Sequence, residues 1–351
     1  MKKLIVLCSL SLVMVGGFIF AKKKTPTPYK IALPSYVARN FESMHFPNAD
    51  NPMTVEGVEL GRHLFYDKNL SKGKNISCAS CHIQAFAFTD SARFSVGFEN
   101  QIGDRNSMPL ANLGWSSAFF WDGRSATLID QIHEPLIDKR EMASTWADAL
   151  AYVKSSAYYT KAFKEAFPKA KMSDVLMKKA LEQFILSITS FNTRYDQYFY
   201  QDKTDALTAQ EIRGFKLFTG KAQCTNCHNT VLVANNQFMN NGLDSMPNMG
   251  YYNATALERD WGLMKTPTLR NVGLTAPYMH DGRFETLEEV VHFYNNNVNK
   301  LSKNLDFRLG KFTRKGGLGL NQEEVTDLIS FLHALTDSTL VTNPQYSDPW
   351  K

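Results

Sequence analysis

The chain has 351 residues, a formal net charge of +5 at pH 7 and 44% hydrophobic side chains. This length is enough for about two domains, and the composition is that of a globular protein. The small positive charge is not the dense basic footprint of a nucleic-acid-binding protein, so we expect no nucleic-acid partner.

The first 21 residues are typical of an export signal. Lys2 and Lys3 precede an apolar run that ends at the small residue Ala21, where a signal peptidase could cut. An uncleaved anchor is the alternative, because the run is close to the lower limit for crossing a bilayer and lysines follow at 22–24. We therefore predict a periplasmic protein, membrane-anchored if the signal is retained, with an N-terminal segment at 22–50 before the first domain.

A short string, CASCH at 78–82, carries two thiols and an imidazole at the spacing that attaches a haem covalently. The thiols would form thioether bonds to the porphyrin edge, and the adjacent histidine would bind the iron as proximal ligand. The same pentad recurs as CTNCH at 224–228, and the one cysteine outside the two pentads is Cys8. A single copy would leave zinc binding or a redox dithiol open, whereas two complete copies favour two covalently bound c-type haems. The predicted attachment and iron-binding residues are Cys78, Cys81, His82, Cys224, Cys227 and His228.

The sequences around the two pentads repeat one another. LGRHLFYDKNLSKGKNIS leads into the first pentad and RGFKLFTGKAQ into the second, while FWDGRSATLIDQ and YMHDGRFETLEEV follow them. We infer an internal duplication that gives two cytochrome c-like haem domains, at 51–204 and 205–351, in a mainly α fold. Thr208 and Glu211 predict a capping box at the start of the second domain. Long loops rich in Asn, Gly and Pro are expected to wrap the haems.

Apolar residues at the 3.6-residue period predict helices over 173–195 and 321–335. A further helix beginning at Thr286 would place Tyr294 on its apolar face and His292 on the opposite face, which makes the tyrosine the better ligand for the second iron. A core tyrosine with a hydrogen-bonded hydroxyl is the alternative, and helical phase alone favours it. Other candidates for this position are Met264, Met279 and His280.

The loop that follows His82 contains phenylalanines but no methionine or histidine that could bind the first iron. More distant candidates in the same domain are Met108, His133, Met142, Met172 and Met177. An iron without a strong sixth ligand binds small molecules, whereas an iron held on both faces mainly transfers electrons. We therefore expect the two haems to differ in function.

Taken in order, several motifs resemble those of the bacterial dihaem cytochrome c peroxidases, and within that family the MauG-like and BthA-like members. The resemblance covers nearly the whole chain after residue 21. It rests on LGRHLFYDKNLS, ISCASCH, RNSMPLAN, FFWDGR, CTNCH, TPTLRNVGLTAPYMHDG and LEEVVHFY.

This resemblance implies roles for residues to which the local sequence alone assigns no function. Trp121, otherwise a core aromatic, would lie between the haems as the electron-transfer bridge. Glu141, otherwise a surface residue, would line the peroxide pocket with Gln131, and burial beside the haem should raise the pKa of its carboxyl. The resemblance also implies a calcium ion between the domains, held by Asn106 and the backbone carbonyls of Thr275 and Pro277.

The chain departs from the founding peroxidases of this family at two positions. Phe98 stands where those enzymes carry a histidine that caps the first haem until reduction. Tyr294 stands where they bind the second iron with methionine, and a tyrosine there is the MauG and BthA pattern. A phenolate ligand stabilises ferric iron, whereas methionine raises the reduction potential.

The resemblance implies an enzyme, a peroxidase that reduces hydrogen peroxide at the N-terminal haem with electrons relayed through the C-terminal haem. Its electron donor would be a small c-type cytochrome or a cupredoxin. A MauG-like enzyme that oxidises a partner protein through a high-valent dihaem state is the alternative, and a dihaem electron carrier without catalysis is the third. The chain could also form a homodimer.

Overall fold

The computed structural model describes residues 25–40 and 49–351. The predicted export signal at 1–21, including Cys8, lies outside the described residues, so export and cleavage stay predictions. Within the described ranges, the helices are all too short or too polar to cross a membrane.

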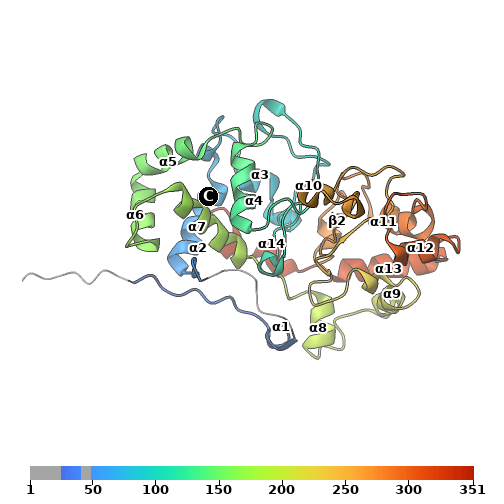
Figure 1. Ribbon diagram of the computed structural model, residues 1–351. Helices are drawn as coiled ribbons and strands as arrows, with labels where there is room; N and C mark the ends of the chain where they lie inside the picture. Colours follow the sequence, from blue (N-terminus) through green and yellow to red (C-terminus); the bar gives the residue numbers. More distant parts are fainter. Residues whose placement is uncertain (1–24, 41–48) are drawn as a thin grey trace, which may run out of the picture.

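Helices make up most of the regular structure, and Figure 1 shows them gathered in two groups, α2–α7 and α9–α13. The helices of the N-terminal arm and first half are α1 (Ser35–Asn40), α2 (Val55–Tyr66), α3 (Cys78–Cys81), α4 (Leu128–Ile137), α5 (Trp146–Ser155), α6 (Ala157–Ala166), α7 (Asp174–Ser187) and α8 (Arg194–Tyr200). The helices of the second half are α9 (Ala209–Thr219), α10 (Tyr252–Thr255), α11 (Leu287–His292), α12 (Phe307–Thr313), α13 (Gln322–Ala334) and α14 (Ser338–Thr342).

Short turns and one strand pair complete the regular structure of the described residues. The 3₁₀ turns are η1 (Lys68–Leu70), η2 (Gln84–Phe86), η3 (Phe98–Asn100), η4 (Leu113–Trp115), η5 (Cys224–Asn226), η6 (Glu258–Asp260), η7 (Val272–Leu274) and η9 (Pro344–Tyr346). The π-helical turn is η8 (Phe293–Asn297), and the strands β1 (Phe238–Met239) and β2 (Met264–Lys265) pair antiparallel. The predicted mainly α fold is confirmed.

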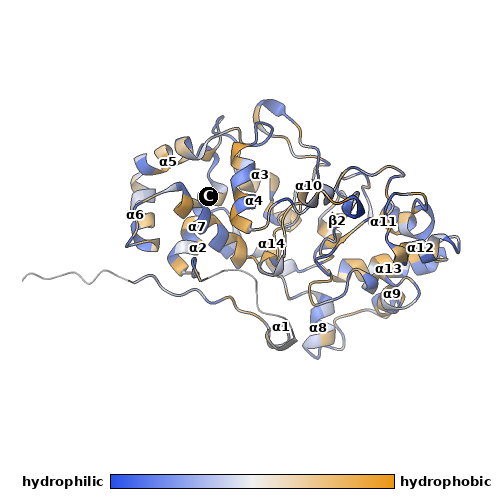
Figure 2. Ribbon diagram, in the orientation of Figure 1, coloured by the Kyte–Doolittle hydropathy of each residue, from blue (hydrophilic) through white to orange (hydrophobic). Residues whose placement is uncertain are grey.

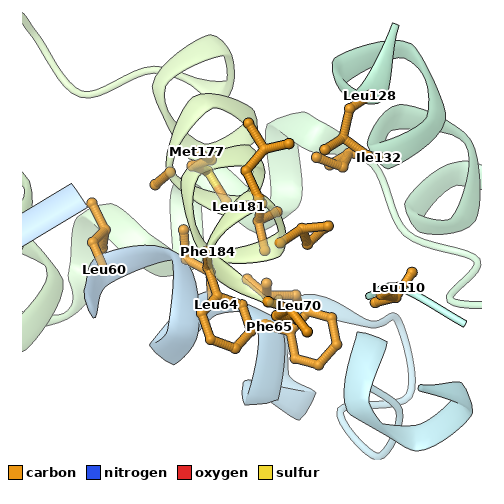
Figure 3. Packing of buried hydrophobic residues seen from close by; sticks show 14 of the residues in the cluster. Leu60, Leu64, Phe65, Leu70, Leu110, Leu128, Ile132, Met177, Leu181 and Phe184 are labelled. Carbon is orange, nitrogen blue, oxygen red and sulfur yellow. The ribbon is translucent and has the colours of Figure 1, made fainter. Parts of the chain in front are cut away.

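The core of the first half forms where α2 packs against α7, and Figure 3 shows their apolar side chains in contact. The rings of Phe65 and Phe184 lie 5.2 Å apart, and Leu64 packs beside them. Gly61 allows this close approach, because a Cβ at that position would collide with the backbone carbonyl of Ala180. Figure 2 shows hydrophobic residues on helices of both halves interrupted by hydrophilic ones, as expected for helices with one buried face.

The core of the second half repeats this arrangement with α9 and α13. Gly214 of α9 occupies the position of Gly61, and a Cβ there would collide with the backbone carbonyl of Asp327. The rings of Phe218 and Phe331 lie 5.2 Å apart beside this contact. The same glycine-to-carbonyl contact therefore joins α2 to α7 in the first half and α9 to α13 in the second.

The turns between these helices are repeated as well. Asn112 and Asn271 adopt left-handed backbone conformations, with φ of 63° and 65°, and each precedes a 3₁₀ turn. The two Asp-Gly-Arg turns are each framed by an isolated bridge, Phe119 with Ser125 and Tyr278 with Phe284. These matching features confirm that the two halves are related by duplication.

The long helix predicted over 173–195 is wrong, because the chain leaves the helix after Ser187 and starts α8 at Arg194. Thr193 and Asp196 form a capping box that begins this new helix. Ser190, between the two helices, donates its backbone N–H to the side chain of Asn112 instead of to a helical carbonyl. The capping box predicted at Thr208 is confirmed at the start of α9. The helix predicted over 321–335 is confirmed as α13.

The two halves are joined by buried polar contacts. Arg270 forms a bidentate ion pair with Asp196 at 2.7 and 2.8 Å, and both side chains are fully buried. The C-terminal tail then returns to the first half, where Leu340 and Tyr346 belong to its hydrophobic core. The domain limits of 51–204 and 205–351 stay a prediction, since this tail packs across them.

Replacing Gly61 or Gly214 by Ala should destabilise the protein by about 1–3 kcal/mol, because the added methyl group meets a backbone carbonyl that cannot move aside. Chemical denaturation of each variant would measure the loss. Gly310→Ala in α12 is the matched control, because a Cβ there meets no atom closer than 4.0 Å and helix propensity favours Ala. Equal stability of all three variants would contradict the packing described above.

Candidate active site

Two cavities lie around the two pentads, and they share part of their walls. The first is lined by Cys78, Cys81 and His82, and the second by Cys224, Cys227 and His228. The two cavities are similar in size. The residues that line both cavities are Asn106, Ser107, Pro109, Trp121 and Lys265.

The histidine of each pentad is oriented by a backbone carbonyl. Nδ1 of His82 lies 2.9 Å from the carbonyl oxygen of Phe88, and Nδ1 of His228 lies 3.3 Å from that of Val233. Burial lowers the pKa of both imidazoles, that of His228 to about 4. Each ring is therefore neutral, with Nδ1–H donating to a carbonyl and Nε2 left as the metal-binding nitrogen.

The cysteines of the pentads are held on short helical turns and are unsuited to redox chemistry as thiols. Burial raises the pKa of Cys78 and of Cys224 to about 12, so neither forms a thiolate at neutral pH. Among the residues that the structure describes, no group of three or more Cys, His, Asp or Glu side chains is placed to hold a metal ion. The pentads do not combine into a zinc site, and each cavity fits a covalently attached haem.

Glu141 and Gln131 line the first cavity together with His82. Gln131 lies on α4, and Glu141 lies in the turn after it, where its carbonyl accepts a hydrogen bond of 2.8 Å from the backbone N–H of Phe98. Burial raises the pKa of the Glu141 carboxyl to about 7, and the charge of Asp138 adds to this effect. A carboxyl with this pKa exchanges its proton readily near neutral pH.

Phe98 does not line the first cavity, and the Lys72 ammonium lies 5.0 Å from the centroid of its ring. His133 stacks on Trp146 and does not line the cavity either. Among the described residues that line this cavity, His82 supplies the one imidazole, and the sulfur donors outside the pentad are the thioethers of Met108 and Met142. The absence of a histidine cap stays a prediction, supported by this arrangement.

Trp121 lines both cavities, and its indole N–H donates to the carbonyl of Asn106 at 2.8 Å. His280 holds the matching position in the second Asp-Gly-Arg motif, and the two rings lie 6.4 Å apart. Nε2 of His280 lies 3.0 Å from the side-chain amide of Asn248, so this nitrogen already has a partner. The duplicated turns therefore bring Trp121 and His280 together in an edge-to-face arrangement beside the wall that the cavities share.

Tyr294 lies in the π-helical turn η8 and lines the second cavity. The helix predicted from Thr286 onward is regular only to His292, and π turns of this kind often occur at functional sites. His292 does not line the cavity and pairs with Glu288 at 3.5 Å instead. The position of Tyr294 suits a ligand opposite His228, and that role stays a prediction.

Asn241 is a site residue that the sequence did not indicate. Its side-chain amide donates to the hydroxyl of Tyr294 at 3.3 Å and lies 3.5 Å from the sulfur of Met279. Burial raises the pKa of Tyr294 to about 12, and the bond from Asn241 acts in the opposite direction. Its place in an asparagine-rich loop predicted to wrap a haem was the one available signal.

The three residues predicted to hold calcium all line the second cavity: Asn106, Thr275 and Pro277. The Asn106 amide nitrogen donates to the carbonyls of Ala92 and Arg93 at 3.3 and 3.2 Å, and its backbone N–H donates to the carbonyl of His280. Asn106 therefore ties the first half to the second at the predicted calcium position.

Comparison with known proteins agrees with this geometry. A family model described as di-haem cytochrome c peroxidase matches residues 55–204. The cytochrome c551 peroxidase of Nitrosomonas europaea is 33% identical over 293 residues, 82% of each chain. The chain belongs to the dihaem cytochrome c peroxidase family.

Two further proteins are similar to this chain over most of its length. The methylamine utilization protein MauG of Methylorubrum extorquens is 32% identical over 314 residues, 88% of this chain and 86% of its own. The crystal structure of a MauG-like protein associated with microbial copper homeostasis is 33% identical and superposes with a TM-score of 0.83, covering 92% of this chain and 100% of that one. Membership of the family establishes two c-type haems as the cofactors, one for each pentad.

If Tyr294 binds the second iron, replacing it by Phe should change the low-spin electron paramagnetic resonance signal of the resting protein, because that iron would lose its oxygen ligand. Tyr278→Phe is the matched control, since its hydroxyl is in the same cavity but donates to the carbonyl of Val272 at 2.9 Å. A Tyr294→Phe spectrum identical to that of the wild-type protein would show that Tyr294 is a core residue and does not bind the iron.

Proposed function

We propose that this protein is a dihaem c-type peroxidase that reduces hydrogen peroxide in the first cavity with electrons that arrive through the second. One observation carries the proposal: a carboxyl of raised pKa, Glu141, and an amide, Gln131, share the first cavity with His82. The second cavity offers Tyr294 in place of such a pair. The two halves therefore have different chemistry around the same attachment motif.

When bound, the haems supply the iron that reacts with peroxide and the path by which electrons reach it. Glu141 takes a proton from one peroxide oxygen and returns it to the other as the bond between them breaks. The Gln131 amide both donates and accepts hydrogen bonds, so it holds peroxide beside that carboxylate. A pKa of about 7 lets Glu141 act as acceptor and then as donor at the same pH.

Trp121 is suited to carry charge between the cavities, because its ring lines both of them. Its N–H bond to the Asn106 carbonyl and the nearby His280 ring fix its orientation. In the second cavity, Asn241 donates to the hydroxyl of Tyr294. Trp121 and Asn106 lie at the wall that both cavities share.

Oxidation of a partner protein, as in a MauG-like enzyme, is the second candidate function. Tyr294, in place of a methionine, favours it, because an oxygen ligand stabilises oxidised iron. Similarity to MauG over 88% of the chain adds support. A carrier without catalysis would have no use for Glu141 and Gln131 in the first cavity.

The donor, location and assembly of this peroxidase form part of the same proposal. We infer a small c-type cytochrome or a cupredoxin as electron donor, and export to the periplasm directed by residues 1–21. A homodimer is compatible with this arrangement. A size measurement of the purified holoprotein would decide its assembly.

A calcium ion at Asn106, Thr275 and Pro277 would stabilise the junction between the halves. Amide and carbonyl oxygens are ligands that calcium prefers. All three residues line the second cavity, and Asn106 lines the first as well. The proposal rests on this convergence and on the family resemblance.

Glu141→Gln should slow the reaction with hydrogen peroxide by roughly 10²–10⁴, the range typical of a general acid–base group. In the unmodified protein the rate should rise with pH around 7, because only the ionised carboxylate can accept the first proton. The variant should lose this rise. Stopped-flow mixing of ferric protein with peroxide across pH 5–9, at about one-unit steps, measures both effects.

Glu134→Gln is the matched control, because Glu134 is exposed on α4 and does not line the cavity. It should react with peroxide at the unmodified rate. A Glu141→Gln rate equal to that of Glu134→Gln would remove Glu141 from the mechanism.

Trp121→Phe should leave the first reaction with peroxide intact but slow the oxidation of a reduced donor cytochrome during turnover, because charge no longer passes readily between the cavities. Comparing the single-turnover rate with steady-state donor oxidation separates the two steps. Trp115→Phe is the control, since Trp115 is buried against Phe191 and lines neither cavity. Unchanged donor oxidation in Trp121→Phe would place the electron path elsewhere.

A further inference from the structure

Lys265 is a buried cation at the wall between the two cavities. It ends the strand β2, is only 6% exposed, and lines both cavities. Its backbone N–H donates to the carbonyl of Trp121 at 2.8 Å. The side chain therefore starts beside the bridging tryptophan and extends from the second half of the chain into the first.

The Lys265 ammonium has neutral partners only among the described residues. It donates to the hydroxyl of Ser116 at 3.1 Å and to the carbonyl of Ala118 at 2.8 Å, and it lies 5.7 Å from the centre of the Phe119 ring. No carboxylate of the described residues lies within ion-pair distance of it. Burial alone, without any opposing charge, lowers the pKa of Lys265 to about 8.

Three of the four described arginines that line the cavities have carboxylate partners among the described residues, and Arg105 is the exception. Arg124 pairs with Asp122 at 2.9 Å, Arg140 with Asp138 at 3.2 Å, and Arg308 with Asp306 at 2.8 Å. These three arginines are also more exposed to solvent than Lys265. Lys265 therefore differs from them in both respects: it is more deeply buried, and it has no acidic partner.

A buried ammonium is stable when an anion or enough hydrogen-bond acceptors surround it. Lysine has three N–H donors, and two acceptors contact Lys265. The missing anion must belong to a group that enters the cavities, and each c-type haem carries two propionate carboxylates. A propionate would supply both the third acceptor and the opposing charge.

We propose that Lys265 is the counter-ion of a propionate of the haem attached at Cys78 and Cys81. The first cavity is favoured because the ammonium lies against 116–119, and Phe119 lines that cavity but not the second. The proposal rests on the proposed function only through the presence of this haem. It does not depend on the reaction with peroxide.

A cation at this place stabilises the reduced, more negative state of the first haem. It therefore raises the reduction potential of that haem relative to the second. This shift favours electron transfer from the second haem to the first. Lys265, carried by the second half of the chain, therefore tunes the potential of the haem attached to the first half.

The test is spectroelectrochemical titration of the two-haem protein with Lys265→Met. The ratio of reduced to oxidised first haem at a fixed potential should fall tenfold or more, which is about 59 mV for one electron. The second haem should shift less. Equal shifts of both haems, or no shift, would overturn the proposal.

Matched variants separate charge from packing. Lys265→Arg keeps the charge and should retain the potential of the first haem, whereas Lys265→Gln keeps polar contacts without the charge and should lower it as Lys265→Met does. Ser116→Ala removes one hydrogen-bond acceptor of Lys265 and should leave both potentials unchanged. A shift in Ser116→Ala as large as that in Lys265→Met would show that Lys265 acts only as a structural tie.

Intact mass shows whether Lys265→Met carries both haems. If it does not, Lys265→Gln takes its place in the potential measurement. Failure of the counter-ion proposal can be told apart from failure of the proposed peroxidase function. A protein without peroxidase activity whose first-haem potential still falls in Lys265→Gln would contradict the reaction and support the counter-ion.

Discussion

The hydrogen bond between each pentad histidine and a backbone carbonyl is the contact on which both cavities depend. The two carbonyls belong to Phe88 and Val233, and each of these residues is buried in the core of its own half. The imidazole therefore takes its orientation from a residue anchored in the hydrophobic core. A histidine fixed in this way presents the same nitrogen to the cavity whatever the surrounding loops do.

The duplicated helix packing gives each haem a pentad histidine on one side. The residues on the opposite side of each cavity differ between the two halves. In each half a glycine lets one helix pack on a backbone carbonyl of another: Gly61 of α2 against α7, and Gly214 of α9 against α13. The residues that face the pentad histidine come from loops and helix ends outside these helix contacts, and there the halves have diverged. A titratable carboxyl, Glu141, lies in one cavity and a phenol, Tyr294, in the other. One scaffold can therefore support a reacting site and an electron-transfer site.

Much of the site could be predicted because its signals are local in sequence. The pentads, the repeated Asp-Gly-Arg turns and the capping box at Thr208 each lie within a few residues, and backbone geometry follows directly from them. The predicted helix over 173–195 was wrong because Ser190 bonds to Asn112, 78 residues away, and apolar periodicity cannot register such a contact. Asn241 and Lys265 were missed for the same reason, since their partners lie 53 and 149 residues away.

The wall between the cavities is where these distant contacts converge. Lys265 bonds through its backbone to Trp121, Trp121 bonds to Asn106, and Asn106 bonds to His280, so two residues of the first half are held between two residues of the second. A displacement of either half would therefore move Trp121 relative to both cavities. The fully buried ion pair of Arg270 and Asp196 opposes such a displacement, because separating it would leave two uncompensated charges in the interior. The hydrogen bonds that hold the two halves together at this wall are therefore also the bonds that fix the position of Trp121 between the cavities.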